Sequence, residues 1–158
     1  MEKIVVGIAE GKTARNGQAL VSYALGSCVG VCLYDTKTKV AAMAHVILPD
    51  KSRAVNQENV YKFAVEGTRE LISEICRQGA SRRTLTAKIA GGARMFRGVE
   101  KGWDIGYWNI QSVKKTLQEE GVRIAGEDTG GSYGRTITFR SEDGVLEIST
   151  VRHEMIYL

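Results

Sequence analysis

Two apolar runs separated by a short polar break constrain this chain more than any other feature of its sequence. The runs are residues 28–34 and 40–48, and the break between them is Asp35–Lys39. Apolar runs of this length on either side of a polar break are typical of a β-hairpin. We therefore predict that strands follow one another directly in this part of the chain.

The remaining pattern is rich in strands at both ends and helical between them. Further β-rich segments lie at residues 3–9, 19–25, 84–90, 122–125, 135–140 and 145–151. Apolar residues recur at helical spacing over about 57–78 and 108–120, and each segment is followed by a glycine, Gly79 or Gly121. This order predicts one layered α/β domain over residues 1–158 with mixed, largely antiparallel strands, and not a doubly wound parallel sheet.

Composition and charge exclude several classes of protein. The net charge of +4 is a modest excess spread along the 158 residues, unlike the dense basic stripe of a nucleic-acid binder. The three cysteines are an odd number and no signal-like segment opens the chain, which indicates reduced thiols and a cytoplasmic protein. No apolar run is long enough to insert in a membrane. The Gly91-Gly92 pair fits neither nucleotide-binding glycine motif.

The predicted hairpin brings a thiol and an imidazole to one face of a sheet. Paired residues in a hairpin share a face, and Cys28 and His45 have numbers with an odd sum, as an even-length turn requires. A turn at Thr36-Lys37 would place them directly opposite each other. A turn at Lys37-Thr38 would make them diagonal neighbours about 7–8 Å apart.

A cysteine beside a histidine is the arrangement of a nucleophile and its general base. An imidazole that accepts the thiol proton makes the thiolate available, and we expect it to lower the pKa of Cys28. Gly26 and Ser27 allow a close approach in which backbone N–H groups face a developing oxyanion. Ser22 is the nearest hydroxyl by position that could orient His45.

Two other interpretations fit the same residues. Cysteine is among the most buried residue types, and a histidine in an apolar run is commonly a hydrogen-bonded core residue. A metal site built from Cys28, Cys32 and His45 is a second alternative, although the cysteine spacing is not that of a zinc motif. Cys32 and Cys76 are predicted to lie in the core.

Four motifs together resemble the CheD-type chemoreceptor glutamine deamidases. They are residues 25–29 (Leu-Gly-Ser-Cys-Val), 42–49 (Ala-Met-Ala-His-Val-Ile-Leu-Pro), 87–93 (Ala-Lys-Ile-Ala-Gly-Gly-Ala) with Met95 and Phe96, and 127–131 (Glu-Asp-Thr-Gly-Gly). The resemblance implies a three-layer α/β Cys-His hydrolase, akin to deamidating bacterial toxins, that needs no cofactor. It also implies the assignment of site residues: Cys28, His45 and Ser22 as the catalytic group, and Gly26, Ser27, Gly91, Gly92 and Phe96 around the oxyanion and substrate.

The family resemblance further implies substrates and partners. The substrates would be glutamines of methyl-accepting chemotaxis receptors, with glutamate methyl esters as a second substrate, and a CheC-type phosphatase would be a partner. A regulatory binding module without catalysis is the alternative function. The chain departs from the family pattern at Ser22, where threonine is usual, and at Trp108, where many relatives carry a basic residue.

Overall fold

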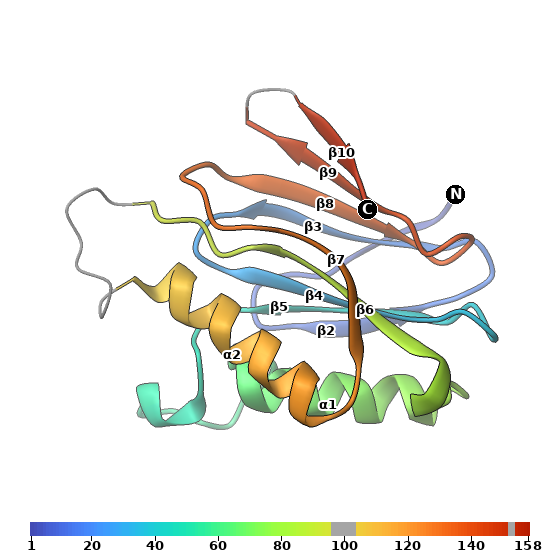
Figure 1. Ribbon diagram of the computed structural model, residues 1–158, viewed down its shortest axis with the longest axis horizontal. Coiled ribbons are helices and arrows are strands. Elements are labelled where there is room, and N and C mark those ends of the chain that lie inside the picture. The colour runs from blue at the N-terminus through green and yellow to red at the C-terminus, as the bar shows by residue number, and fades with distance from the viewer. Residues whose placement is uncertain (96–103, 152–153) are drawn as a thin grey trace.

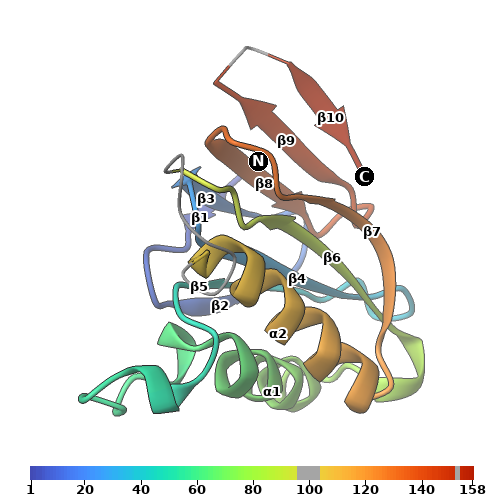
Figure 2. The ribbon, with the colours of Figure 1, turned by 60° about the vertical axis from the view of Figure 1, so that its left-hand side comes forward.

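The computed structural model describes residues 1–95, 104–151 and 154–158, and these form three stacked layers. Two five-stranded sheets lie face to face, and two α-helices cover the outer face of the second sheet (Figure 1). The turned view separates the three layers clearly, with both helices on the same side (Figure 2). The predicted three-layer α/β fold is confirmed.

The first sheet joins strands from both ends of the described chain. In spatial order its strands are β1 (Lys3–Val5), β3 (Ala19–Leu25), β8 (Arg135–Arg140), β9 (Leu146–Thr150) and β10 (Met155–Tyr157). β1 runs parallel to β3, and the other neighbours are antiparallel. Residues alternate between buried and half-buried along β8 and β9, as expected of strands with one face on a core.

The second sheet is the central layer and carries the predicted hairpin. Its order is β2 (Gly11–Ala14), β5 (Ala41–Val46), β4 (Val29–Asp35), β6 (Leu85–Gly91) and β7 (Arg123–Thr129). Only β6 and β7 are parallel among these neighbours. Every residue of β4 and β5 is buried, because this layer is covered on both faces.

The two helices are α1 (Ala64–Arg77) and α2 (Ile105–Glu119). Their apolar faces pack on the second sheet and enclose one hydrophobic core with it, which includes Leu71, Ile75, Val113 and Leu117. A second core fills the space between the two sheets. No helix of the described residues is long and apolar enough to cross a lipid bilayer.

The hairpin has the second of the two predicted registers, the one with the turn at Lys37-Thr38. Gly30 pairs with His45 and Tyr34 with Ala41, which leaves Asp35 to close a turn with Val40. This register corresponds to the turn centred on Lys37 and Thr38. It makes the positions of Cys28 and His45 diagonal neighbours on one face.

β1, β7 and α2 have ends other than those predicted, and three further differences concern the architecture. The first helix begins at Ala64 and not near residue 57, because the chain forms a short 3-10 turn at Val60–Lys62 and then extends at the buried Phe63 to bridge Leu48. β2 lies between the predicted strand segments 3–9 and 19–25, where no strand was predicted. β10 pairs with β9 although its three residues give no strand pattern.

Candidate active site

The imidazole of His45 is held by a hydrogen-bonded chain between the two sheets. Its Nδ1 lies 2.8 Å from Oγ of Ser22, and the same Oγ donates to the carbonyl oxygen of Val6 at 2.8 Å. A serine hydroxyl has one proton, so Oγ that donates to Val6 must accept from Nδ1–H. The other ring nitrogen, Nε2, is then unprotonated and can accept a proton. The structure thus brings Ser22 to His45, as the sequence suggested.

The contact between Ser22 and His45 joins two strands of different sheets. Ser22 lies on β3 of the first sheet and His45 on β5 of the second, and both residues are buried. The backbone of His45 is tied to the segment before β2, since its N–H donates to the Glu10 carbonyl at 3.0 Å. The ring is therefore fixed from the strand side as well as by Ser22.

Cys28 lies immediately before β4, at the edge of the core between the sheets. It is half-buried and packs against that core, which faces the same space as His45 and Ser22. Gly30 is paired with His45, and side chains alternate between the two faces of a sheet. Cys28, two positions before Gly30, is therefore on the same face as His45. This placement gives the thiol partial access to solvent and the imidazole almost none.

Burial disfavours the charged form of both titrating groups. It raises the pKa of the Cys28 thiol, although the residue's own backbone N–H pulls that pKa down. It also lowers the pKa of His45, against the effect of the Val6 backbone group. Desolvation disfavours the charged form of each group, so burial favours a neutral thiol and a neutral imidazole. Burial of the pair, which the sequence does not show, opposes the expected lowering of the Cys28 pKa.

The turn that carries the cysteine is anchored through three successive carbonyl groups. The Gly26 oxygen accepts from Ala93 N–H at 2.9 Å, and the Cys28 oxygen accepts from Gly92 N–H at 2.8 Å. Between them, the Ser27 oxygen accepts from the side-chain amide of Asn109 at 3.0 Å. Within the described residues, neither the N–H of Ser27 nor that of Cys28 donates to another residue, and the Cys28 N–H acts on its own thiol.

Gly91 lets β6 approach the turn closely. Its φ is +110°, and a Cβ at this position would overlap the carbonyl oxygen of Cys28. A residue with a side chain would suffer both backbone strain and a clash with backbone that cannot move aside. The glycine pair thus supports the turn that carries Cys28, and the Gly92 N–H is used in its hydrogen bond to the Cys28 oxygen.

The other predicted residues are distributed as follows. Phe96 lies outside the described residues. Cys32 is fully buried and burial raises its pKa, while Cys76 packs half-buried against the helix core. Within residues 1–95, 104–151 and 154–158, no three His, Cys, Asp or Glu side chains are grouped as a metal would need.

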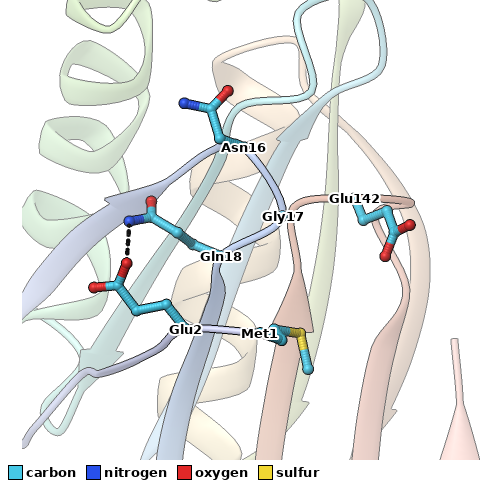
Figure 3. A pocket seen from close by; sticks show the side chains of 6 residues that line it. All are labelled: Met1, Glu2, Asn16, Gly17, Gln18 and Glu142. Atoms are coloured by element: carbon cyan, nitrogen blue, oxygen red, sulfur yellow. Dashed lines mark hydrogen bonds between the residues drawn. The ribbon is translucent and has the colours of Figure 1, made fainter.

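Two cavities differ in their relation to this site. A cavity of about 410 Å³ adjoins the cysteine turn and is lined by residues that include Gly26, Met95 and Arg135. A larger one, of about 690 Å³, is bordered by Glu2, Gln18 and Glu142, and Figure 3 shows the hydrogen bond from Gln18 to Glu2 across it. It lies at the Ala19 end of β3, whereas Cys28 follows the Leu25 end, so it is remote from the thiol.

Sequence reasoning missed two contributors. The Val6 carbonyl, which fixes the direction of the Ser22 proton, left no signal because backbone groups are not specific to residue type. Asn109 did leave one: it is a polar residue four positions before Val113 on the apolar face of α2, and it is fully buried. A polar residue on a core-facing stripe is a signal of a buried hydrogen-bonding role.

A three-layer mixed α/β fold that presents a cysteine and a hydroxyl-bound histidine between its sheets has the arrangement of groups found in cysteine hydrolases. Comparison with known proteins gives the family. A profile described as "CheD chemotactic sensory transduction" matches residues 47–150. The chain belongs to the CheD family.

Relatives match nearly the whole chain. A probable chemoreceptor glutamine deamidase CheD of Clostridium novyi (strain NT) is 45% identical over 152 residues, covering 95% of this chain and 94% of the relative. Proteins of the same name from Syntrophomonas wolfei and Caldanaerobacter subterraneus are 43% and 41% identical, with 97% of this chain covered in each case and 97% and 96% of the relative. Among solved structures, the hypothetical protein YfiH of Bacillus licheniformis aligns with 77% of this chain and 49% of its own, with a TM-score of 0.49 and 13% identity.

Proposed function

We propose that this protein deamidates glutamine side chains of methyl-accepting chemotaxis receptors in the cytoplasm, with Cys28 as nucleophile, His45 as general base and Ser22 as the residue that orients His45. The observation that carries the proposal is the chain from Val6 through Ser22 to Nδ1 of His45. It leaves Nε2 as the proton acceptor on the face that Cys28 shares. The names of the relatives supply the substrate class.

The first half of the reaction releases ammonia. Since the thiol of the resting pair is neutral, it must lose its proton when it reacts. The Cys28 proton moves to Nε2 of His45 as Sγ attacks the side-chain carbonyl carbon of the glutamine. The tetrahedral intermediate carries the negative charge on its oxygen. The imidazolium then donates its proton to the amide nitrogen, the carbon–nitrogen bond breaks, and a thioester remains on Cys28.

The second half consumes water. His45 takes a proton from a water molecule, and the resulting hydroxide attacks the thioester carbon. The carbon–sulfur bond breaks, the thiolate recovers the proton from His45, and a glutamate side chain leaves. The sum is glutamine plus water giving glutamate plus ammonia. A glutamate methyl ester would give the same thioester with methanol as the leaving group.

The backbone N–H groups of Ser27 and Cys28 are assigned to the oxyanion. Both belong to the anchored turn, and neither donates to another residue among the described residues. Fixed donors aimed at a developing charge are the largest single source of rate in many acyl transfers. Gly91 and Gly92 are assigned a supporting role beneath Cys28, and Gly26 gives access from the adjoining cavity.

Ammonia release from purified receptor cytoplasmic fragments tests the proposal. Cys28→Ala is expected to abolish release, and Cys76→Ala is the matched control because that half-buried thiol lies on the far helix. Mass spectrometry should show a gain of about 1 Da at the modified glutamines. Equal rates for wild type and Cys28→Ala would exclude the scheme.

A binding module acting with a CheC-type phosphatase is the alternative function. It is separated from catalysis by Cys28→Ser in cells, because serine preserves the surface while removing the thiol. Full chemotaxis with this variant would favour binding. Loss of chemotaxis together with normal folding would favour chemistry at Cys28.

A further inference from the structure

The buried side-chain amide of Asn109 joins the turn that carries Cys28 to the segment that follows His45. The Nδ2 group of Asn109 donates to the Ser27 oxygen at 3.0 Å and to the Ile47 oxygen at 3.0 Å. Ser27 precedes Cys28, and Ile47 follows His45 by two residues. Both amide protons are therefore used, one on each side of the site.

The amide stands where the β4–β5 ladder ends. The last pair of that ladder is Val29 with Val46, and beyond it the N–H of Ile47 turns away to the Lys62 carbonyl. Asn109 reaches this gap from the first turns of α2, where it is fully buried on the face that packs against the sheet. Its Oδ1 is buried with no hydrogen-bond partner among the described residues, so the side chain is held there by its two donors.

The Ser27 carbonyl belongs to the same peptide group as the Cys28 N–H. No peptide bond among the described residues is cis, and in a trans peptide the C=O and N–H point in opposite directions. Fixing the Ser27 oxygen toward α2 therefore fixes the Cys28 N–H away from α2. The bond from Ala93 to the Gly26 oxygen fixes the Ser27 N–H in the same way.

We infer that Asn109 is a positioning residue whose side-chain amide sets the direction of the Cys28 N–H as an oxyanion donor and holds the nucleophile turn at a constant distance from the strand of the base. This inference rests on the proposed function for its chemical meaning. Asn109 does not touch the reacting atoms. Its effect passes through one peptide plane.

The experiment uses Asn109→Leu, which keeps the approximate volume and removes both donors. The expected result is a fall in kcat of about a hundredfold, the loss typical of one misdirected oxyanion donor, with KM changed by less than about threefold. Alkylation of Cys28 by iodoacetamide needs the thiol and His45 but no oxyanion donor. Its rate is expected to stay within about threefold of wild type.

Val113→Ala is the matched control. It lies on the same buried face of α2, one turn further along, and removes packing without touching the turn. Its kcat and its Cys28 alkylation rate are expected to match those of wild type. Asn109→Ser, with one donor and a smaller volume, provides a second variant in case leucine does not fit.

Hydrogen exchange gives a readout that does not depend on turnover. The amides of Gly92 and Ala93 donate to the anchored turn, so both should exchange faster in Asn109→Leu than in Val113→Ala. Unchanged exchange, or a kcat no lower than that of the control, would overturn the inference. A parallel loss of kcat and alkylation would also overturn it, since that is general disruption. Failure of the proposed function appears separately, as an inactive wild type or an active Cys28→Ala.

Discussion

At the scale of single residues, the site depends on where one proton resides. The Ser22 hydroxyl donates its hydrogen bond to the Val6 carbonyl, so Nδ1–H of His45 donates to the Ser22 oxygen, and Nε2 is left unprotonated. That the positions of Cys28 and His45 share one face of the sheet was predictable, because the face on which a residue lies depends only on its number along the hairpin. The protonation state was not, because it depends on burial that only the folded chain has.

Removing the Ser22 hydroxyl should weaken His45 as a base. We expect Ser22→Ala to lower kcat about tenfold, since a lost hydrogen bond in such a position costs about 1–2 kcal/mol. Ser22→Thr keeps the hydroxyl and is expected to retain activity within about threefold. Steady-state ammonia release measures both, and nitrogen NMR of the ring should show the Nδ1–H tautomer in wild type and in the threonine variant. Full activity of Ser22→Ala would show that the ring needs no such partner.

Burial of the Cys28 thiol predicts a definite pH dependence for its reactivity. Burial raises the pKa of Cys28, so its alkylation rate should increase with pH to a midpoint above the ordinary thiol value of about 8.5. Limiting iodoacetamide with mass spectrometry separates Cys28 from the buried Cys32. A midpoint clearly below 8.5 would instead indicate a thiolate–imidazolium pair.

At the scale of elements, the sequence predicted the positions of most strands and helices, but not all of their ends. β3 and β8 match the predicted segments, since their apolar residues stop where the strands stop. The start of α1 could not be seen, because a tertiary bridge from Leu48 to Phe63 holds the preceding residues extended. β2 and β10 form on the edges of sheets, where pairing with a neighbour replaces an apolar pattern.

The β4–β5 turn is set by a buried carboxylate. Asp35 accepts hydrogen bonds from the N–H groups of Lys37 and Ser81 and from the hydroxyls of Thr38 and Thr84. Burial raises the pKa of Asp35, but these four donors outweigh it and leave the pKa below its ordinary value. The turn fixes the register that places Gly30 opposite His45.

We therefore expect Asp35→Asn to destabilise the fold by about 2–3 kcal/mol at neutral pH, because an amide nitrogen then faces buried donors. Since the folded pKa is depressed, the stability from Asp35 is present above the unfolded pKa of about 3.9 and is lost as pH falls below it. The variant should lose part of this acid dependence. Urea unfolding at pH 3 to 7 measures both effects, with the exposed Glu58→Gln as control. Equal acid slopes for wild type and Asp35→Asn would contradict the assignment.

At the scale of the whole molecule, the site exists because two sheets are held at one spacing. Ser22 belongs to the first sheet and His45 to the second, so their 2.8 Å contact depends on that spacing. Gly30 is the pairing partner of His45, and Ile137 is the pairing partner of Ser22. A Cβ on Gly30 would overlap Cδ1 of Ile137. Because glycine has no side chain, Gly30 allows the two sheets to approach closely beside the Ser22–His45 contact.

Gly30→Ala should push the two layers apart at this point. We expect a loss of about 1–2 kcal/mol in the free energy of unfolding, since overpacking a core outweighs the smaller entropic gain of alanine, and a lower kcat because the Ser22–His45 contact lengthens. Ile137→Val removes Cδ1 and alone costs about 0.5–1.5 kcal/mol. If the contact is the cause, the double variant is more stable than the sum of the two losses by about 1 kcal/mol and regains activity. Strictly additive losses in urea unfolding, with no recovery of ammonia release, would place the effect of Gly30 in its own strand and not in the spacing of the sheets.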